Sequence, residues 1–303
     1  MIAIHQLGKR YAKSGVQALH DVSFEVKSGE LFGLIGPDGA GKTTLFRILA
    51  TLLKPDDGYA EINGLNVVTH YRDIRRSIGY MPGQFVLYKD LSVRENLEFF
   101  ASVFGSSIAD NYALIRPVYS QIERFEDRRA GQLSGGMKQK LALSCALVHR
   151  PSVLLLDEPT TGVDPVSRKE FWESLQTLRA EGMTILVSTP YMDEARLCDR
   201  IALIERGQIL DTDAPAHIAA RYDRPLLEVR GPDMFGLLHI LREWEGAEAC
   251  YAFGAGHHLM LREGRRESDL QAYLQERGVG QAQVSAIAPG IEDAFMRLLN
   301  QSR

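Results

Sequence analysis

The fold is decided by one stretch, "LFGLIGPDGAGKTTLFRILATLL", residues 31–53. It begins with a continuous apolar run, which is typical of a strand buried on both faces. A glycine-rich loop follows, and apolar residues at helical spacing come after it. The loop fits the pattern G-x-x-x-x-G-K-[ST], in which backbone N–H groups converge on phosphate oxygens at the positive end of a helix. The alternative is an ordinary glycine-rich turn, but the strand before the loop and the helix after it favour phosphate binding.

The loop also predicts individual roles. We expect Lys42 to reach the β- and γ-phosphates of a nucleotide and the Thr43 hydroxyl to ligate Mg²⁺. The predicted nucleotide-binding residues of this loop are Gly36, Pro37, Asp38, Gly39, Ala40, Gly41, Lys42, Thr43 and Thr44.

Two acids end a second buried strand, "VLLLDEP", residues 153–159. Asp157 at the strand tip is positioned to hold Mg²⁺, and Glu158 could orient and polarise an attacking water. Such a pair is ambiguous alone, because many strands end in acids that cap the next helix. Its place in the same α/β pattern as the phosphate loop favours the catalytic interpretation.

A second anion-binding helix start is predicted in "QLSGGMKQK", residues 132–140. Ser134 precedes Gly135 and Gly136, and lysines occupy the first turns of the helix. One nucleotide does not need two such loops from one chain, so the second is explained if it reaches a nucleotide held by another subunit. Taken alone, the motif would be a serine N-cap followed by two flexible glycines.

Strands that alternate with helices predict an α/β sheet. Residues 1–30 resemble antiparallel strands at a sheet edge, and "RIALIERGQIL" resembles a hairpin. "TILVS" is a further buried strand, and "YMDEARLCDR" is predicted to be helical. Residues 92–150 form a predicted helical insertion. We place a domain boundary near Tyr222, which gives domains 1–221 and 222–303, the second a small α+β unit.

Composition favours a globular protein of the cytoplasm. The chain has 303 residues, of which 45% are hydrophobic and 24% charged, with a net charge of −4. That balance gives no reason to expect a nucleic-acid partner, which would require a basic surface. We expect no secretory signal and no membrane helix, because no stretch approaches about 18 apolar residues. Three widely spaced cysteines suit a reducing compartment.

In this order the motifs resemble those of the ATP-binding subunit of an ATP-binding cassette (ABC) transporter, over about residues 1–220. The loop resembles the Walker A motif, "LSGGM" the signature, "VLLLDEP" the Walker B strand, and "TTGVDP" the D-loop with its Asp164. Tyr11 matches the aromatic residue that stacks on adenine, although a strand-edge tyrosine is the alternative. The resemblance implies a P-loop NTPase core with an antiparallel β-subdomain and a helical subdomain, with ATP and Mg²⁺ as ligands.

The resemblance also implies a head-to-tail dimer and a membrane partner. Two ATPs would each lie between the Walker motifs of one subunit and the signature of the other. The chain would then power a separate transmembrane permease from the cytoplasmic face of the membrane. The tail "PGIEDAFMRLL", residues 289–299, resembles the drug and polymer exporter branch. A soluble ABC clamp or regulator is the alternative, as is a scaffold that does not hydrolyse ATP.

Two loops depart from the family pattern. In "GYMPGQFVLYKDLSV" the spacing to Leu87 and Leu91 places the family's glutamine position at Gly83, and Gln84 is one residue late. A shift of one residue turns a side chain to the opposite face, although a bulge at Gly83 could restore it. With that bulge, Gln84 is a candidate catalytic residue and metal ligand.

The second departure is Pro190, which stands where the family has a histidine in S-x-H-x-x-[DE]-E-A. Proline cannot hydrogen-bond a γ-phosphate. We hypothesise an asymmetric dimer in which this chain's own site hydrolyses ATP slowly while its signature completes the site of a partner. The rival is a homodimer in which Tyr191, Gln84 or a water replaces the missing contacts. Elsewhere, His257 and His258 could bind a metal, but a solvated loop is the favoured interpretation.

Overall fold

The computed structural model describes residues 1–83, 87–222 and 224–301. They fall into two compact units, Met1–Pro215 and Ala216–Arg303, which are described separately. This division lies slightly before the boundary expected near Tyr222, and the assignment of domains 1–221 and 222–303 stays a prediction. No helix among the described residues combines the length and hydrophobicity required to cross a bilayer.

The first unit is built on a largely parallel sheet, which confirms the α/β prediction. Its strand order is β10-β9-β3-β8-β7-β6, and only the β9–β10 hairpin is antiparallel. Every residue of β3, β7 and β8 is buried, as expected where helices cover both faces of a sheet. The strands are β3 (Leu31–Ile35), β6 (Ile78–Met81), β7 (Val153–Asp157), β8 (Thr184–Thr189), β9 (Arg200–Glu205) and β10 (Gln208–Asp213).

The N-terminal strands form a sheet of their own rather than the edge of the main one. Its order is β2-β1-β4-β5, so β1 lies inside the sheet. The strands are β1 (Ile2–Arg10), β2 (Gln17–Val26), β4 (Asp57–Ile62) and β5 (Leu65–Asn66). Alternate residues of β2 are buried in a core shared with helix α1 (Lys42–Leu49). The expected antiparallel β-subdomain is confirmed, and β2 lies at its edge, whereas β1 is covered because it also pairs with the distant β4.

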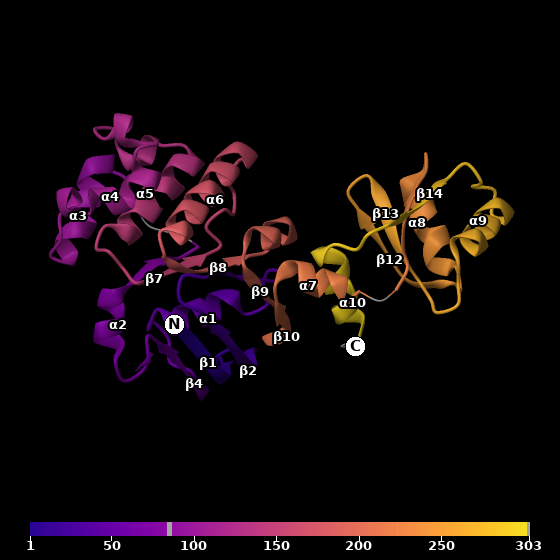
Figure 1. The fold of residues 1–303 in the computed structure, drawn as a ribbon, viewed down its shortest axis with the longest axis horizontal. Helices are drawn as coiled ribbons and strands as arrows, with labels where there is room; N and C mark the ends of the chain where they lie inside the picture. Colours follow the sequence, from indigo (N-terminus) through magenta and orange to yellow (C-terminus); the bar gives the residue numbers. More distant parts are fainter. Residues whose placement is uncertain (84–86, 223, 302–303) are drawn as a thin grey trace. The chain divides into compact units, whose positions relative to one another are not determined.

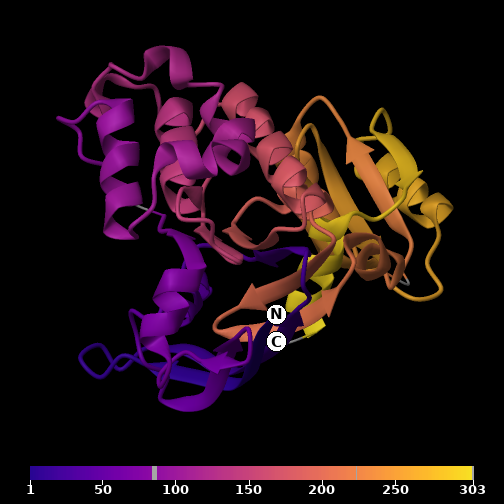
Figure 2. The same cartoon turned by 60° about the vertical axis from the view of Figure 1, so that its left-hand side comes forward.

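The predicted helical insertion is confirmed as α3 (Val93–Val103), α4 (Ile108–Tyr119) and α5 (Gly135–Leu147), with short 3₁₀ turns at Glu123–Phe125 and Ala130–Gln132. These helices lie on the opposite side of the main sheet from the N-terminal strands (Figures 1 and 2).

Other helices adjoin strands of the main sheet along the chain. Helix α2 (Tyr71–Ser77) precedes β6, α6 (Pro165–Ala180) follows β7, and α7 (Pro215–Ala220) follows β10. The helix predicted in "YMDEARLCDR" is present as a 3₁₀ helix, η3 (Met192–Leu197).

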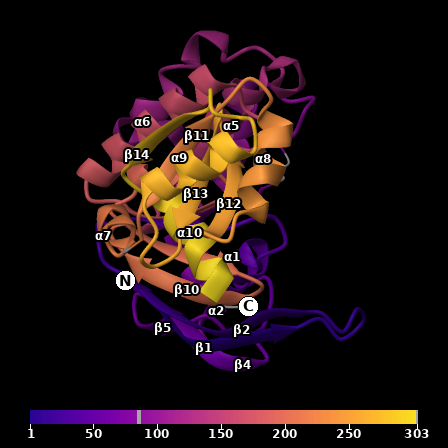
Figure 3. The same cartoon turned by 90° about the vertical axis from the view of Figure 1, so that its right-hand side faces the viewer.

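The second unit is a four-stranded antiparallel sheet with order β12-β13-β11-β14. Helices α8 and α9 lie beside this sheet (Figure 3). Their buried leucines share one core with its strands. The elements are β11 (Leu226–Arg230), α8 (Met234–Glu243), β12 (Ala247–Phe253), β13 (Gly256–Leu261), α9 (Glu267–Glu276), β14 (Gln283–Ile287) and α10 (Ile291–Gln301). The unit is therefore of the predicted α+β kind.

His257 and His258 lie in β13, so the interpretation as a solvated loop was wrong. Both are buried, at 3% and 6% exposure, and they pair with residues of β12 across the hairpin. His258 Nδ1 lies 2.6 Å from Asp293 Oδ1, and the Tyr251 hydroxyl donates to the same oxygen at 2.7 Å. These contacts join β12 and β13 to α10, and His257 Nε2 lies 2.6 Å from the Met234 carbonyl oxygen, so both histidines have structural contacts.

Candidate functional site

The phosphate loop runs from the end of β3 to the first residue of α1. A Cβ on Gly36 would lie 2.1 Å from the Ile204 carbonyl oxygen, so no larger residue fits there. Gly41 has φ +107°, and a Cβ on it would lie 2.5 Å from the Ala18 carbonyl oxygen. Glycine is the residue that adopts such a conformation without strain. The glycine spacing that predicted phosphate binding is therefore required by the backbone itself.

Lys42 is held inside this loop, with a side chain that is 2% exposed. Its Nζ donates to the carbonyl oxygens of Gly36 at 2.8 Å and Pro37 at 2.9 Å. It also lies 3.0 Å from Glu158 Oε1. The structure thus brings the loop lysine and the second acid of the β7 strand together, although they come from distant parts of the chain.

Asp157, at the end of β7, is 1% exposed. Its Oδ1 accepts a hydrogen bond from Ser188 Oγ at 2.7 Å. Burial raises the pKa of the Asp157 carboxyl above its ordinary value, and hydrogen bonds from Ser188 and Thr43 oppose that shift. A buried carboxylate beside the Thr43 hydroxyl offers the oxygen ligands that Mg²⁺ prefers, so the residues fit the predicted metal.

Glu158 has a strained backbone, with φ +49° in the left-handed region. Its N–H donates to Ser188 Oγ at 2.9 Å and to the Ser188 carbonyl oxygen at 3.1 Å. Strain of this kind in a non-glycine residue is often found at functional sites. Ser188 therefore positions both acids, a role that the sequence analysis missed because the serine had only been counted as part of a strand.

The first altered loop lies against Asp157, the predicted metal ligand. A Cβ on Gly83 would lie 3.2 Å from the Asp157 carbonyl oxygen and 4.0 Å from Asp157 Oδ2. Gln84, the candidate catalytic and metal-binding residue, lies outside the described residues. Gly83 therefore offers no side chain at a position beside Asp157.

The second altered loop lies at the same edge of the sheet. Pro190 follows β8, which pairs with both β3 and β7. The Gly36 N–H donates to the Thr189 carbonyl oxygen at 3.3 Å, so the residue before Pro190 is bonded to the first glycine of the phosphate loop. Proline places no polar side-chain atom there.

The signature packs against the D-loop. Ser134 caps α5 by accepting a hydrogen bond from the Met137 N–H at 3.3 Å. Ser134 and Gly135 are exposed, whereas Gly136 is buried against Ser167. Asp164 caps α6 by accepting from the Ser167 N–H at 3.0 Å, and that hydrogen bond lowers the pKa of the Asp164 carboxyl. The two motifs therefore form one surface built from the starts of α5 and α6.

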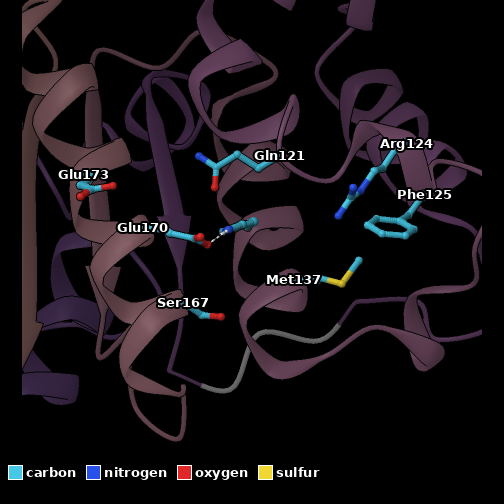
Figure 4. A pocket seen from close by; sticks show the side chains of 8 residues that line it. Gln121, Arg124, Phe125, Met137, Ser167, Glu170 and Glu173 are labelled. Atoms are coloured by element: carbon cyan, nitrogen blue, oxygen red, sulfur yellow. Dashed lines mark hydrogen bonds and ion pairs between the residues drawn. The ribbon is translucent and has the colours of Figure 1, made fainter.

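One lysine of the signature helix is not free to bind an anion, contrary to expectation. Lys140 is 7% exposed, and its Nζ lies 2.5 Å from Glu170 Oε2 on α6. This pair lies in a pocket of about 500 Å³ beside the signature (Figure 4), which is also lined by Met137 and Ser167. Helical spacing alone could not show that Lys140 faces α6.

Tyr11 lies beside the start of α1. Its hydroxyl is 3.3 Å from Thr44 Oγ1. The predicted adenine-stacking residue is therefore close to the phosphate loop, at the end of β1.

Comparisons with known proteins agree on one family. A family model described as "ABC transporter" matches residues 19–161. The probable multidrug ABC transporter ATP-binding protein YbhF of Escherichia coli (strain K12) is 36% identical over 304 residues, 99% of this chain and 52% of that protein. The chain thus spans about half the length of that relative. The Nod factor export ATP-binding protein I of Burkholderia orbicola (strain AU 1054) is 43% identical over 236 residues, 77% of each chain.

Solved structures of ATP-binding cassettes share the fold. The dimeric MJ0796 cassette superposes with a TM-score of 0.64 at 28% identity, over 71% of this chain and 98% of that chain. An ATP-binding subunit of an ABC transporter gives a TM-score of 0.66 at 30% identity, over 73% of this chain and 93% of that chain.

Gly136→Ala should destabilise the first unit by about 1–3 kcal/mol, the usual cost of overpacking. Its Cβ would lie 2.3 Å from Ser167 Oγ, so α5 and α6 must move apart. Gly135→Ala is the control, because its Cβ meets nothing closer than 3.8 Å. Denaturant unfolding measures both, and Ser167→Gly should restore much of the loss. Equal stability of the two alanine variants would contradict the packing argument.

Asp157→Asn should raise the free energy of unfolding at pH 8. Because the folded-state pKa of Asp157 is raised, its charged form costs stability above that pKa, and the cost vanishes as the pH falls below the unfolded-state value. The difference from wild type should therefore shrink towards zero near pH 4. Denaturation across this pH range measures it, with the exposed Asp127→Asn as a control that stays flat. A destabilised Asp157→Asn protein at pH 8 would refute the assigned cause.

Proposed function

The chain belongs to the ABC transporter family of ATP-binding proteins, and on that premise we propose that it binds and hydrolyses ATP to power a separate membrane permease. The observation that carries the proposal is the 3.0 Å contact between Lys42 Nζ and Glu158 Oε1. It joins the two groups that the reaction needs, a phosphate-binding lysine and a carboxylate that can take a proton from water.

Each residue of the site has a role in this proposal. The loop N–H groups and Lys42 bind the phosphates, and Tyr11 stacks on the adenine. Thr43 and Asp157 would hold Mg²⁺, which neutralises phosphate charge when bound. Glu158 orients the attacking water. Because Lys42 is bound to Glu158 in the structure, a phosphate that attracts Lys42 also releases Glu158 for water.

The exposed signature supports a dimer. Ser134 and Gly135 lie at the surface at the start of α5, where backbone N–H groups can face an anion outside this chain. We propose that they face the ATP of a second ATPase subunit. Among the described residues, no hydrogen bond or ion pair joins Ser134 to its own phosphate loop. The solved MJ0796 cassette is described as dimeric, which is consistent with this arrangement.

The altered loops support an asymmetric dimer. Gly83 supplies no side chain beside Asp157, and Pro190 supplies no polar atom beside the phosphate loop. Loss of a positioned contact to developing charge costs about 10²-fold or more in rate. The chain's own site therefore binds ATP but turns it over slowly, while its signature completes the site of a partner that has the histidine.

An apolar groove of about 440 Å³ is the proposed contact with the permease. It lies between the end of α1, β6 and helices α3 and α5. Leu52 and Val103, which are 59% and 61% exposed, carry the apolar lining of the groove to the surface, and a contiguous apolar patch of this kind often marks a partner contact. We propose that a helix of the permease occupies it on the cytoplasmic side of the membrane. The export functions in the names of the relatives favour an exporter.

The first test is ATP binding and hydrolysis by the purified chain. Wild type should bind Mg²⁺·ATP in a manner that Lys42→Ala abolishes, with turnover that Gly83→Gln combined with Pro190→His raises about 10-fold or more. Calorimetry measures binding and radiolabelled ATP measures turnover. Fast turnover that is unchanged by these two substitutions would instead indicate a self-sufficient homodimer. Absence of ATP binding would refute the proposed function.

The second test is membrane association. Val103→Glu should lower the amount of the chain bound to membranes from its own cells by about 10-fold, because burying a charge in an apolar contact is costly. ATP binding by the purified variant should be unchanged. Val16→Glu is the matched control, since Val16 is 55% exposed and lies outside the groove. Equal release by the two variants, or a wild type that never reaches membranes, would favour a soluble clamp.

A further inference from the structure

A buried carboxylate joins the segments around the ATP site. Glu194, in η3, is 2% exposed. Its Oε1 accepts from Thr160 Oγ1 at 2.9 Å, and its Oε2 accepts from Thr189 Oγ1 at 2.5 Å. Thr160 follows Glu158 by two residues, and Thr189 directly precedes Pro190. Glu194 therefore connects the segment that carries Glu158 to the Pro190 turn.

The connection continues to the phosphate loop. Thr189 is fully buried, and its carbonyl oxygen accepts from the Gly36 N–H. Pro190 has no N–H, so the Tyr191 N–H is the first donor in the turn, and it donates to Thr189 Oγ1 at 3.0 Å. The hydrogen bonds thus run in series from Tyr191 through Thr189 to Glu194. Such a series fixes the direction of each hydroxyl.

Arg168 holds the same turn against α6. Its Nη2 lies 2.6 Å from Asp193 Oδ2, and its Nε lies 3.6 Å from Glu194 Oε1. Its guanidinium carbon is 4.9 Å from the centre of the Tyr191 ring. Arg168 also supplies an opposite charge to Glu194, which two threonine hydroxyls alone would not neutralise.

We propose that Glu194 is a positioning residue of the ATP site, and this inference rests on the proposed function. It fixes the positions of Glu158 and the Pro190 turn relative to the phosphate loop. A buried charge is costly, and apolar residues of similar volume often stabilise a fold better. Here both carboxylate oxygens bind hydroxyls that flank functional positions. The carboxylate thus fixes the backbone on both sides of the site, through Thr160 after Glu158 and through Thr189 before Pro190.

The test separates binding of ATP from the rate of the chemical step. Glu194→Gln keeps the volume and one carbonyl oxygen, whereas Glu194→Ala removes both acceptors. We expect the Kd for Mg²⁺·ATP to stay within about 3-fold, while the single-turnover rate falls about 10-fold for glutamine and about 100-fold for alanine. Excess enzyme with radiolabelled ATP makes even a slow rate measurable. Glu173→Gln, at a 64% exposed carboxylate on α6, is the matched control and should leave both quantities unchanged.

Thr160→Val is a second variant that removes one donor without a change in volume. It should slow the single-turnover rate, and its effect should be less than additive with that of Glu194→Gln, because both act on one contact. Unchanged rates in the Glu194 variants would overturn the inference. So would a joint fall of rate, ATP affinity and melting temperature in Glu194→Gln, which would indicate a structural role alone.

The inference and the proposed function fail in different ways. If wild type does not bind Mg²⁺·ATP in a Lys42-dependent manner, the proposed function fails. If wild type binds ATP but its single-turnover rate does not exceed that of Lys42→Ala, the site is inert. That result overturns the positioning role of Glu194 while leaving ATP binding intact.

Discussion

The functional edge of the first unit is organised around the contact of Lys42 with the acids at the end of β7. Strands β3, β8 and β7 are neighbours and run parallel, so their carboxyl ends lie at one edge of the sheet. That edge places the phosphate loop, the Pro190 turn and the Asp157–Glu158 pair side by side. The 3.0 Å ion pair between Lys42 and Glu158 and the hydrogen bond of Thr43 with Asp157 join the first and last of these segments.

This arrangement is costly for the fold. Lys42, Asp157 and Glu194 are each no more than 2% exposed, although ionised side chains lose their hydration on burial. Each is compensated by specific partners, namely loop carbonyls for Lys42, Ser188 for Asp157, and two threonines for Glu194. Natural proteins often accept lower stability where charge must be positioned for a reaction. The cluster of three such residues at one sheet edge is therefore better explained by chemistry than by stability.

The sequence predicted what depends on local pattern and missed what depends on distant partners. The phosphate loop and strands β3, β7 and β8 were predictable, because apolar runs and glycine spacing report local structure. The antiparallel β-subdomain was implied by the family resemblance, but the pairing of β1 with β4 was not predictable, since β4 lies far along the chain. For the same reason, helical spacing could not show that Lys140 faces Glu170. Glu194 was visible only as part of a family pattern, because its partners Thr160 and Arg168 are joined to it by tertiary packing.

Residues 83 and 190 and the signature are held by different contacts, and this bears on why the proposed slow site could persist. Gly83 and Pro190 lie beside Asp157 and the phosphate loop, whereas the shape of the signature is set by the packing of Gly136 on Ser167 and by the Asp164 cap of α6. Loss of polar side chains at residues 83 and 190 leaves that packing untouched. A chain can therefore lose turnover at its own site while its signature surface keeps the form that a partner subunit requires. The ion pairs of Arg168 with Asp193 and Glu194 still join this turn to α6, although proline places no polar side-chain atom at residue 190.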